Sequence, residues 1–205
     1  MRVGVLASGE GTNLQALLDT VHGHEVDVVA VASDQPSAPA LERAAAAGVP
    51  SRVFLRSEYG ARAARDAAIA DWLVSEGVEL VVLAGYMAIL DASFVARFPD
   101  RILNVHPSLL PAFPGVRAIE QALEHGVKVF GVTVHLVDEG VDTGPIVLQR
   151  AVELPGASDP AAVHASLRRI EHELLPRAVA LIATGRLRRD PSHPRRVLMD
   201  EESGP

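Results

Sequence analysis

The sequence predicts an α/β protein with a doubly wound, mostly parallel sheet and antiparallel strands at its C-terminal side. Two observations carry this prediction. Before Gly115, short and almost continuously apolar runs alternate with Ala-rich, helix-like segments, a rhythm typical of strands buried on both faces of a parallel sheet. After Gly115, two long apolar runs follow each other without a helix between them, which favours antiparallel pairing at one side of the sheet.

Each element has its own signal. The expected strands are residues 3–7, 26–32, 52–55, 80–84, 102–106, 127–137 and 146–153. The expected helices are residues 14–21, 40–47, 62–75 and about 159–183. Gly48, with Pro50 beyond it, ends the second helix, and Gly77 follows the third. Apolar residues in the long helix repeat at spacings of three, four and seven, which predicts that one face packs on a core.

Length and composition limit the classes of protein to which this chain can belong. A chain of 205 residues suits a single domain, 1–205, with a short hairpin in the tail and disorder at about 200–205. The net charge of −7 speaks against a nucleic-acid partner. Cysteine is absent and no apolar segment is long enough for a membrane span, so we expect a cytoplasmic protein without membrane contact. The histidines form no H-E-x-x-H pattern, and no metal is expected. The oligomeric state stays open.

A glycine-rich turn, LASGEGTNL at residues 6–14, follows the first expected strand. Gly9 and Gly11 allow a tight turn and a close approach to the backbone, and the N–H groups at a helix start attract anions. Thr12 and Asn13 can add donors or cap the helix. The turn matches neither G-x-G-x-x-G nor a P-loop. Phosphate binding and an ordinary strand-to-helix turn are therefore both open.

Two polar residues, Asn104 and His106, lie at the C-terminal end of the strand 102–106. Ligands bind at this end of strands in open α/β sheets, and alternation places both side chains on one face. An amide can donate to a carbonyl oxygen, and an imidazole can donate or move a proton. Because no nucleophile elbow is present, the pair suits a site that polarises a carbonyl for attack by a substrate. Anchoring the Pro-rich loop after Pro107 is the structural alternative.

An acidic loop, HLVDEGVDTGPI at residues 135–146, carries Asp138, Glu139 and Asp142. A carboxylate that faces His106 would favour the charged imidazolium. A solvated acidic loop without a role in chemistry is the alternative.

Four segments together resemble the phosphoribosylglycinamide formyltransferase family, folate-dependent enzymes of purine biosynthesis. They are SGEGTN, AGYMAIL at 84–90, LNVHPSLLPAFPG at 103–115 and DTGP at 142–145. The resemblance runs from Met1 to about Leu187. Methionyl-tRNA formyltransferase is similar but has an additional C-terminal domain, and formyltetrahydrofolate hydrolase has a regulatory domain before its first strand. The length, the acidity and the early first strand of this chain favour the ribonucleotide enzyme.

The resemblance implies a Rossmann-like formyltransferase fold, small-molecule substrates and 10-formyltetrahydrofolate as co-substrate, without a metal. The residues that it places at the ribonucleotide are Gly11, Thr12, Asn13, Arg168 and Glu171. Those that it places at the folate are Arg62, Met87, Ala88, Ile89, Leu90, Asn104, Asp138, Glu139, Gly140, Val141 and Asp142. Many relatives carry Arg where this chain has Ala88, near the acidic tail of the folate.

The implied mechanism is direct attack of the glycinamide amine on the formyl carbon, without a covalent enzyme intermediate. Asn104 and protonated His106 would stabilise the oxyanion. Asp142 would keep His106 charged and order a water that relays the proton. The resemblance also implies that the Leu110–Pro111 bond can be cis. A hydrolase, in which water replaces the amine, and a nucleotide-binding regulatory module without chemistry are the rival functions.

Overall fold

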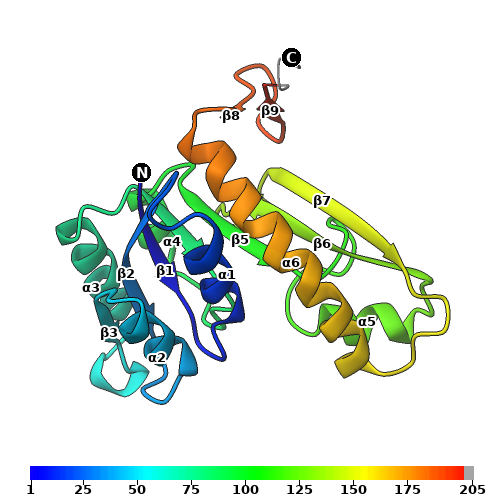
Figure 1. Cartoon of the computed structure of the whole chain (residues 1–205), viewed down its shortest axis with the longest axis horizontal. Helices are drawn as coiled ribbons and strands as arrows, with labels where there is room; N and C mark the ends of the chain where they lie inside the picture. The colour runs from blue at the N-terminus through cyan, green and yellow to red at the C-terminus, as the bar shows by residue number, and fades with distance from the viewer. Residues whose placement is uncertain (201–205) are drawn as a thin grey trace.

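The computed structural model describes residues 1–200 and has a seven-stranded sheet at its centre (Figure 1). The strand order is β3-β2-β1-β4-β5-β6-β7. The strands are β1 (Arg2–Leu6), β2 (Asp27–Ser33), β3 (Ser51–Val53), β4 (Leu80–Leu83), β5 (Ile102–His106), β6 (Val129–Leu136) and β7 (Ile146–Glu153). The strands from β3 to β5 pair in parallel, whereas β6 is antiparallel to both β5 and β7. The predicted fold class is confirmed.

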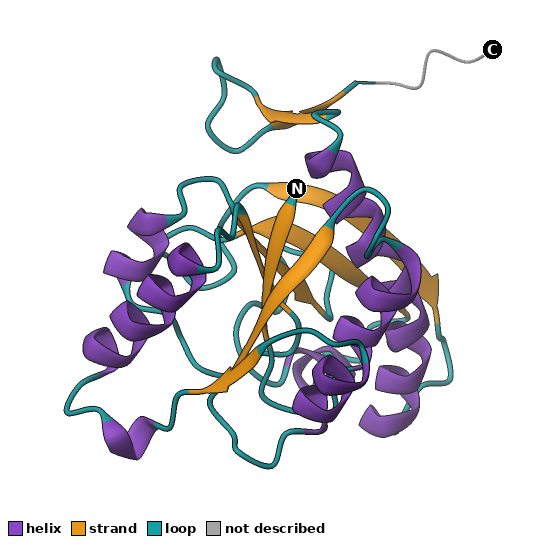
Figure 2. Cartoon of the chain, turned by 60° about the vertical axis from the view of Figure 1, so that its left-hand side comes forward, coloured by secondary structure: helices purple, strands orange, loops and turns teal. Residues whose placement is uncertain are grey.

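Helices cover both faces of the sheet (Figure 2). They are α1 (Thr12–Thr20), α2 (Pro39–Ala46), α3 (Arg62–Ser75), α4 (Ala92–Arg97), α5 (Ala118–Glu124) and α6 (Pro160–Ala183). The larger apolar cluster packs α1, α2, α5 and α6 on one face, and the smaller one packs α3 and α4 on the other. Burial of both faces explains why the strands of the parallel part are continuously apolar.

The chain reverses its winding direction between β1 and β4, which are neighbours in the sheet. From β1 it continues outward to β2 and β3, and from β4 it continues in the other direction to β5. The loops that follow β1, β4 and β5 therefore open at the same edge. This switch point is where open α/β sheets form a ligand crevice.

Some elements differ from their prediction. The helices α4 and α5 have six and seven residues, too short for a periodic apolar pattern to show. A single turn of 3-10 helix, η1 (Arg56–Glu58), follows β3. Strand β3 stops at Val53, before the expected end, and the side chain of Phe54 is fully buried in the core. Helix α1 begins at Thr12, two residues earlier than predicted, with Gly11 at its N-cap.

The tail forms the predicted hairpin, from β8 (Leu187–Arg189) and β9 (Val197–Met199). This hairpin lies apart from the central sheet (Figure 2). Residues 201–205 lie outside the described residues, so the disorder expected at about 200–205 stays a prediction. The expectation of a single domain stays a prediction too.

Candidate active site

A cavity of about 850 Å³ opens at the switch point, lined by the loops that follow β1, β4 and β5 and by one face of α6. It brings together the predicted site residues Gly11, Thr12, Asn13, Met87, Ala88, Ile89, Leu90, Asn104, His106, Asp138, Glu139, Gly140, Val141, Asp142, Arg168 and Glu171. Arg62 is the exception, since it lines a neighbouring cavity of about 570 Å³. Met87, Ala88 and Ile89 line both cavities.

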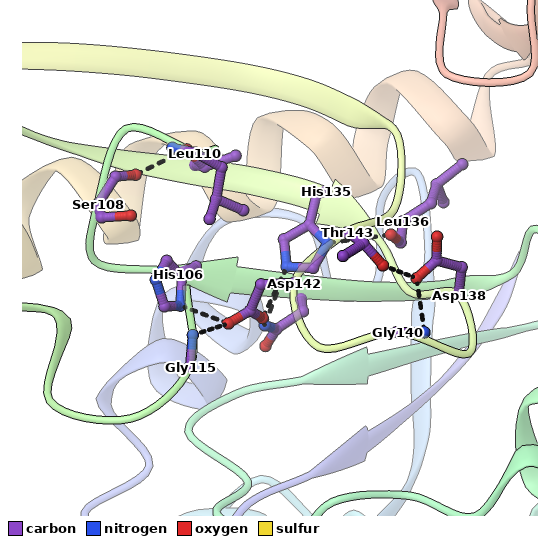
Figure 3. Close-up of polar contacts among 12 residues, drawn as sticks. His106, Ser108, Leu110, Gly115, His135, Leu136, Asp138, Gly140, Asp142 and Thr143 are labelled. Carbon is purple, nitrogen blue, oxygen red and sulfur yellow. Dashed lines mark hydrogen bonds and ion pairs between the residues drawn. The ribbon is translucent and has the colours of Figure 1, made fainter. Parts of the chain in front are cut away.

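Asp142 lies at the centre of a polar cluster, between His106 and His135 (Figure 3). Its Oδ2 is 3.3 Å from Nδ1 of His106 and accepts a hydrogen bond of 2.7 Å from the Gly115 N–H. Its Oδ1 is 3.4 Å from Nδ2 of Asn104. The backbone of Asp142 is left-handed, with φ of 52°, a strained conformation for a residue with a side chain. The acidic loop therefore contacts Asn104 and His106 through the side chain of Asp142.

The imidazole of His106 is held between two hydrogen-bond acceptors. The imidazole is 5% exposed. Its Nε2 donates to the Phe113 carbonyl oxygen at 2.8 Å, because a carbonyl can only accept. Nδ1 faces the carboxylate of Asp142, and a lone pair there would be repelled. The ring is thus fixed with the Phe113 carbonyl on one side and the carboxylate of Asp142 on the other.

His135, which the sequence interpretation did not assign a role, completes the cluster. It lies opposite Asn104 in the antiparallel β5–β6 pair and is 1% exposed. Its Nδ1 donates to the Leu136 carbonyl oxygen at 3.0 Å. Its Nε2 lies 3.1 Å from Nδ2 of Asn104 and 3.4 Å from Oδ1 of Asp142. His135 thereby contacts both the amide of Asn104 and the carboxylate of Asp142.

The pKa of Asp142 lies below its usual range. Burial acts in the opposite direction, because it raises the pKa of this carboxyl. Hydrogen bonds from His135 and the Gly115 N–H, together with the charge of His106, outweigh burial and lower it. The carboxylate is therefore charged at neutral pH and can act as the counter-charge of an imidazolium.

The glycine-rich turn and α6 form the other end of the cavity. No side chain caps α1, so the capping role considered for Thr12 and Asn13 is wrong. Nδ2 of Asn13 instead donates to Oε2 of Glu171 at 2.9 Å, which ties α1 to α6. With its N-terminus uncapped, α1 presents backbone donors and the positive end of its dipole to the cavity.

Glu10 and Arg168 form an ion pair at this end, with Oε2 and Nη1 3.2 Å apart. Both residues line the cavity, and the sequence interpretation assigned no role to Glu10. The carboxylate of Glu10 is thus paired with Arg168, the cation that the resemblance assigns to the phosphate of the ribonucleotide.

Gly11 allows a stability prediction that is independent of any ligand. Its φ is +69°, and a Cβ there would lie 2.7 Å from Cα and Cβ of Ala40. We expect Gly11→Ala to lower the free energy of unfolding by about 1–3 kcal/mol, as measured by urea denaturation. Gly9→Ala is the matched control, since nothing lies within 4 Å of its added Cβ. Equal effects of the two variants would show that neither the positive φ of Gly11 nor its contact with Ala40 requires glycine at this position.

The lip of the cavity is apolar and exposed. The side chains of Met87, Ile89 and Val141 are 74%, 62% and 51% exposed. Asp138 closes the opposite loop by accepting from the Gly140 N–H at 3.1 Å and from Oγ1 of Thr143 at 2.6 Å. Apolar walls with nearby backbone polar groups are typical of sites for flat organic ligands.

The Pro-rich loop that follows β5 is fixed by hydrogen bonds to its neighbours. The Thr133 hydroxyl accepts from the Leu110 N–H and donates to the Ser108 carbonyl oxygen. The Leu110–Pro111 bond is cis, the state that the resemblance allowed. The loop therefore presents the Phe113 carbonyl to His106 from a fixed position.

Within 1–200, no helix is both long and apolar enough to cross a membrane. The same residues contain no group of three or more His, Cys, Asp or Glu side chains arranged to hold a metal ion. The expectation that no metal is needed stays a prediction.

Comparison with known proteins places these features in a family. The family model described as formyl transferase matches residues 1–179. The phosphoribosylglycinamide formyltransferase of Haemophilus influenzae is 41% identical over 91% of this chain and 89% of that protein. The trifunctional purine biosynthetic protein adenosine-3 of Drosophila pseudoobscura is 44% identical over 92% of this chain. The chain spans only 14% of the length of that multifunctional relative.

Solved structures agree with the sequence relatives. Glycinamide ribonucleotide transformylase 1 from Symbiobacterium toebii has a TM-score of 0.94 at 47% identity, covering 98% of this chain and 94% of that one. Phosphoribosylglycinamide formyltransferase from Anaplasma phagocytophilum has a TM-score of 0.91 at 35% identity, covering 100% and 96%. The resemblance inferred from the four motifs is confirmed.

Proposed function

The chain belongs to the formyl transferase family, and we propose that it transfers the formyl group of 10-formyltetrahydrofolate to the amine of 5′-phosphoribosylglycinamide in purine biosynthesis. The observation that carries this proposal is the buried cluster of Asn104, His106 and Asp142 at the wall of the switch-point cavity. Its groups are hydrogen-bond donors and a fixed charge pair, and no serine nucleophile elbow is present in the sequence. Such a site suits attack by an amine that a substrate supplies.

In the proposed reaction the amine attacks the formyl carbon and a tetrahedral intermediate forms. The bond from carbon to folate N10 then breaks, and the proton lost by the amine passes to N10 through a water that Asp142 orders. The charged His106 stabilises the oxyanion of the intermediate. Good alignment of the two substrates in one cavity can supply roughly 7–11 kcal/mol more.

The donors are engaged before substrate binds, so the reaction requires an exchange of hydrogen bonds. The contact from Asn104 to Oδ1 of Asp142 is long, at 3.4 Å, and we propose that the formyl oxygen replaces it. Nε2 of His106 donates to the neutral carbonyl of Phe113. A developing oxyanion competes well for that hydrogen, because its negative charge attracts the donor more strongly than a neutral carbonyl does. His135 keeps the Asn104 amide in place during this exchange.

The ribonucleotide is proposed to occupy the opposite end of the cavity. The N–H groups of Gly11, Thr12 and Asn13 and the guanidinium of Arg168 are its phosphate contacts, and Glu171 is the partner of its ribose hydroxyls. The uncapped start of α1 and the shared cavity wall support this assignment. The folate is proposed to lie against Met87, Ala88, Ile89, Leu90, Asn104 and the loop 138–142, with Arg62 near its acidic tail.

The test of the function is a folate absorbance assay with and without the ribonucleotide. We expect the donor to be consumed only when glycinamide ribonucleotide is present. Consumption at the same rate without the ribonucleotide would favour a hydrolase instead. A failure to consume the donor under either condition, with both ligands bound, would favour a regulatory module.

A substitution of Glu10 should strengthen ribonucleotide binding, whereas most active-site substitutions weaken substrate binding. Its carboxylate competes with a substrate phosphate for Arg168. We therefore expect Glu10→Gln to tighten ribonucleotide binding by about two- to fivefold, the scale of an exposed ion pair. Calorimetry at low salt measures this, with Glu25→Gln as the control on a distant exposed loop. Weaker binding in Glu10→Gln would mean that Glu10 instead holds Arg168 in its binding position.

The remaining expectations concern the cell and the partners. The cytoplasmic location and the absence of a nucleic-acid partner stay predictions, and the oligomeric state stays open.

A further inference from the structure

The hydroxyl of Ser8 lies between the loops that follow β1, β2 and β4 and makes a hydrogen bond to each of the other two loops. We infer that Ser8, oriented by Asp34, is a positioning residue for the folate, because it holds the segment 86–90 in the place where the donor binds. This inference rests on the proposed function, since it takes the ligand at this segment to be a folate. It adds two residues to those described above for the site.

The segment 86–90 has few hydrogen bonds of its own. Of its backbone N–H groups, only that of Met87 donates within the part of the chain that the structure describes, to Oγ of Ser8 at 3.0 Å. Just before the segment, the Gly85 carbonyl oxygen accepts from the Ser8 N–H at 3.1 Å. The next fixed N–H group is that of Asp91. The hydrogen bond that fixes the backbone between these two ends therefore comes from Ser8.

Asp34 sets the direction of the Ser8 hydroxyl. A hydroxyl has one hydrogen to donate and two lone pairs that accept. Oγ of Ser8 donates its hydrogen to Oδ1 of Asp34 at 2.6 Å, a length typical of a hydroxyl bound to a charged carboxylate. The lone pairs are thereby left for the Met87 N–H. Ser8 thus acts as an acceptor toward Met87 because Asp34 takes its hydrogen.

The loop that carries Asp34 is itself closed by hydrogen bonds. The preceding residue, Ser33, is buried, and its hydroxyl accepts from the Gln35 N–H and donates to the Gln35 carbonyl oxygen, both at 3.1 Å. Asp34 therefore lies in a small fixed turn at the end of β2. A series of contacts then leads from this buried strand through Asp34 and Ser8 to the exposed Met87.

The glycine-rich turn that follows Ser8 has anchors of its own. The Gly9 carbonyl oxygen accepts from the Ala40 N–H at 3.2 Å, and the Glu10 carbonyl oxygen accepts from Nε of Arg43 at 2.8 Å. Both donors belong to α2, so the turn stays in place without the Ser8 hydroxyl. Ser8 should therefore affect the folate end of the cavity and not the ribonucleotide end.

The free backbone groups beyond Met87 explain why the position of the segment matters. The N–H and C=O groups of Ala88, Ile89 and Leu90 make no hydrogen bond within the described residues, and all three residues line the larger cavity. A flat ligand with donors and acceptors at its edge can pair with these groups only in one placement. A displacement of about 1 Å is enough to lose such contacts.

The test measures the binding of tetrahydrofolate and of glycinamide ribonucleotide to Ser8→Ala by calorimetry. We expect the affinity for tetrahydrofolate to fall about three- to tenfold, the scale of one lost hydrogen bond, with the affinity for the ribonucleotide unchanged. In steady-state kinetics the KM of the formyl donor should rise by the same factor, with little change in kcat. Ser75→Ala, at an exposed serine outside both cavities, should behave as the parent does.

Two further variants separate the hydrogen bond from the packing of the side chain. Ser8→Cys fills nearly the same space with a weak acceptor, and it should show the same selective loss of tetrahydrofolate affinity. Ser8→Thr keeps the hydroxyl, and it should bind tetrahydrofolate more tightly than Ser8→Ala and Ser8→Cys do.

Unchanged affinity of Ser8→Ala and Ser8→Cys for tetrahydrofolate would overturn the inference. So would an equal loss of affinity for both ligands, because Ser8 would then support the cavity as a whole. If the parent does not bind tetrahydrofolate, the proposed function fails at its folate site and this inference fails with it. If the parent and both variants bind it equally, the proposed function stands and only the role of Ser8 is lost.

Discussion

We expect His106→Ala to turn over at least about a hundredfold more slowly than the parent, the usual scale for removing an oxyanion donor or proton-transfer group. The imidazole lies between two acceptors, the Phe113 carbonyl and the Asp142 carboxylate. In the proposed mechanism, alanine removes both the positive charge and the donor that the oxyanion requires. It also leaves the carboxylate of Asp142 without its counter-charge.

Steady-state kinetics of formyl transfer, together with direct binding of both substrates, measures this effect. The loss should appear in kcat, with little change in the affinity for either substrate. His24→Ala, on an exposed loop away from the cavity, should behave as the parent does. Near-normal turnover of a folded His106→Ala variant would remove His106 from the mechanism.

A loss of about a hundredfold or more is also expected for Asp142→Asn, which keeps the size of the side chain and removes its charge. The amide cannot neutralise the imidazolium of His106 as the carboxylate does. Its nitrogen would also present hydrogens to neighbours that are themselves donors, among them the Gly115 N–H. In the proposed mechanism, this substitution weakens both the charge on His106 and the order of the relaying water.

Because the pKa of Asp142 is lowered, the difference in stability between Asp142→Asn and the parent should depend on pH. A carboxyl whose pKa is lower in the folded state contributes stability above its unfolded pKa of about 3.9. That contribution is lost as the pH falls through the folded-state pKa. Asp142→Asn should therefore be less stable than the parent at pH 7, with a difference that narrows below about pH 4.

Urea unfolding at neutral and acidic pH tests this signature, with Asp71→Asn as the control. Asp71 is 71% exposed in its pair with Arg97, so its replacement should change stability little at either pH. A stability difference between Asp142→Asn and the parent that does not change with pH would show that the charge of Asp142 is not what its neighbours stabilise.

The features that depend on a local pattern of apolar and polar residues could be predicted from the sequence. The strands that build the parallel sheet were visible as apolar runs, and the alternation at Asn104 and His106 placed both side chains at the ligand edge. The long helix α6 was visible through its apolar repeat. Each of these signals lies within one short segment.

Features that depend on how distant segments meet were not readable. His135 faces Asn104 only because β6 returns antiparallel in one register, and a shift of one residue would turn it away. The pair of Glu10 with Arg168 joins a turn to a helix far along the chain. The need for glycine at Gly11 comes partly from the backbone of Ala40. The sequence did not predict helices α4 and α5, because a helix of one or two turns is too short to show an apolar repeat.

We propose that the cluster of Asn104, His106 and Asp142 directs the formyl group to an amine and not to water. The most direct test labels the formyl carbon of 10-formyltetrahydrofolate and follows the label by NMR or mass spectrometry. With glycinamide ribonucleotide present, we predict that all label lost from the donor appears on the ribonucleotide, one for one with the tetrahydrofolate released. Release of the label as free formate, at a rate independent of the ribonucleotide, would contradict the claim.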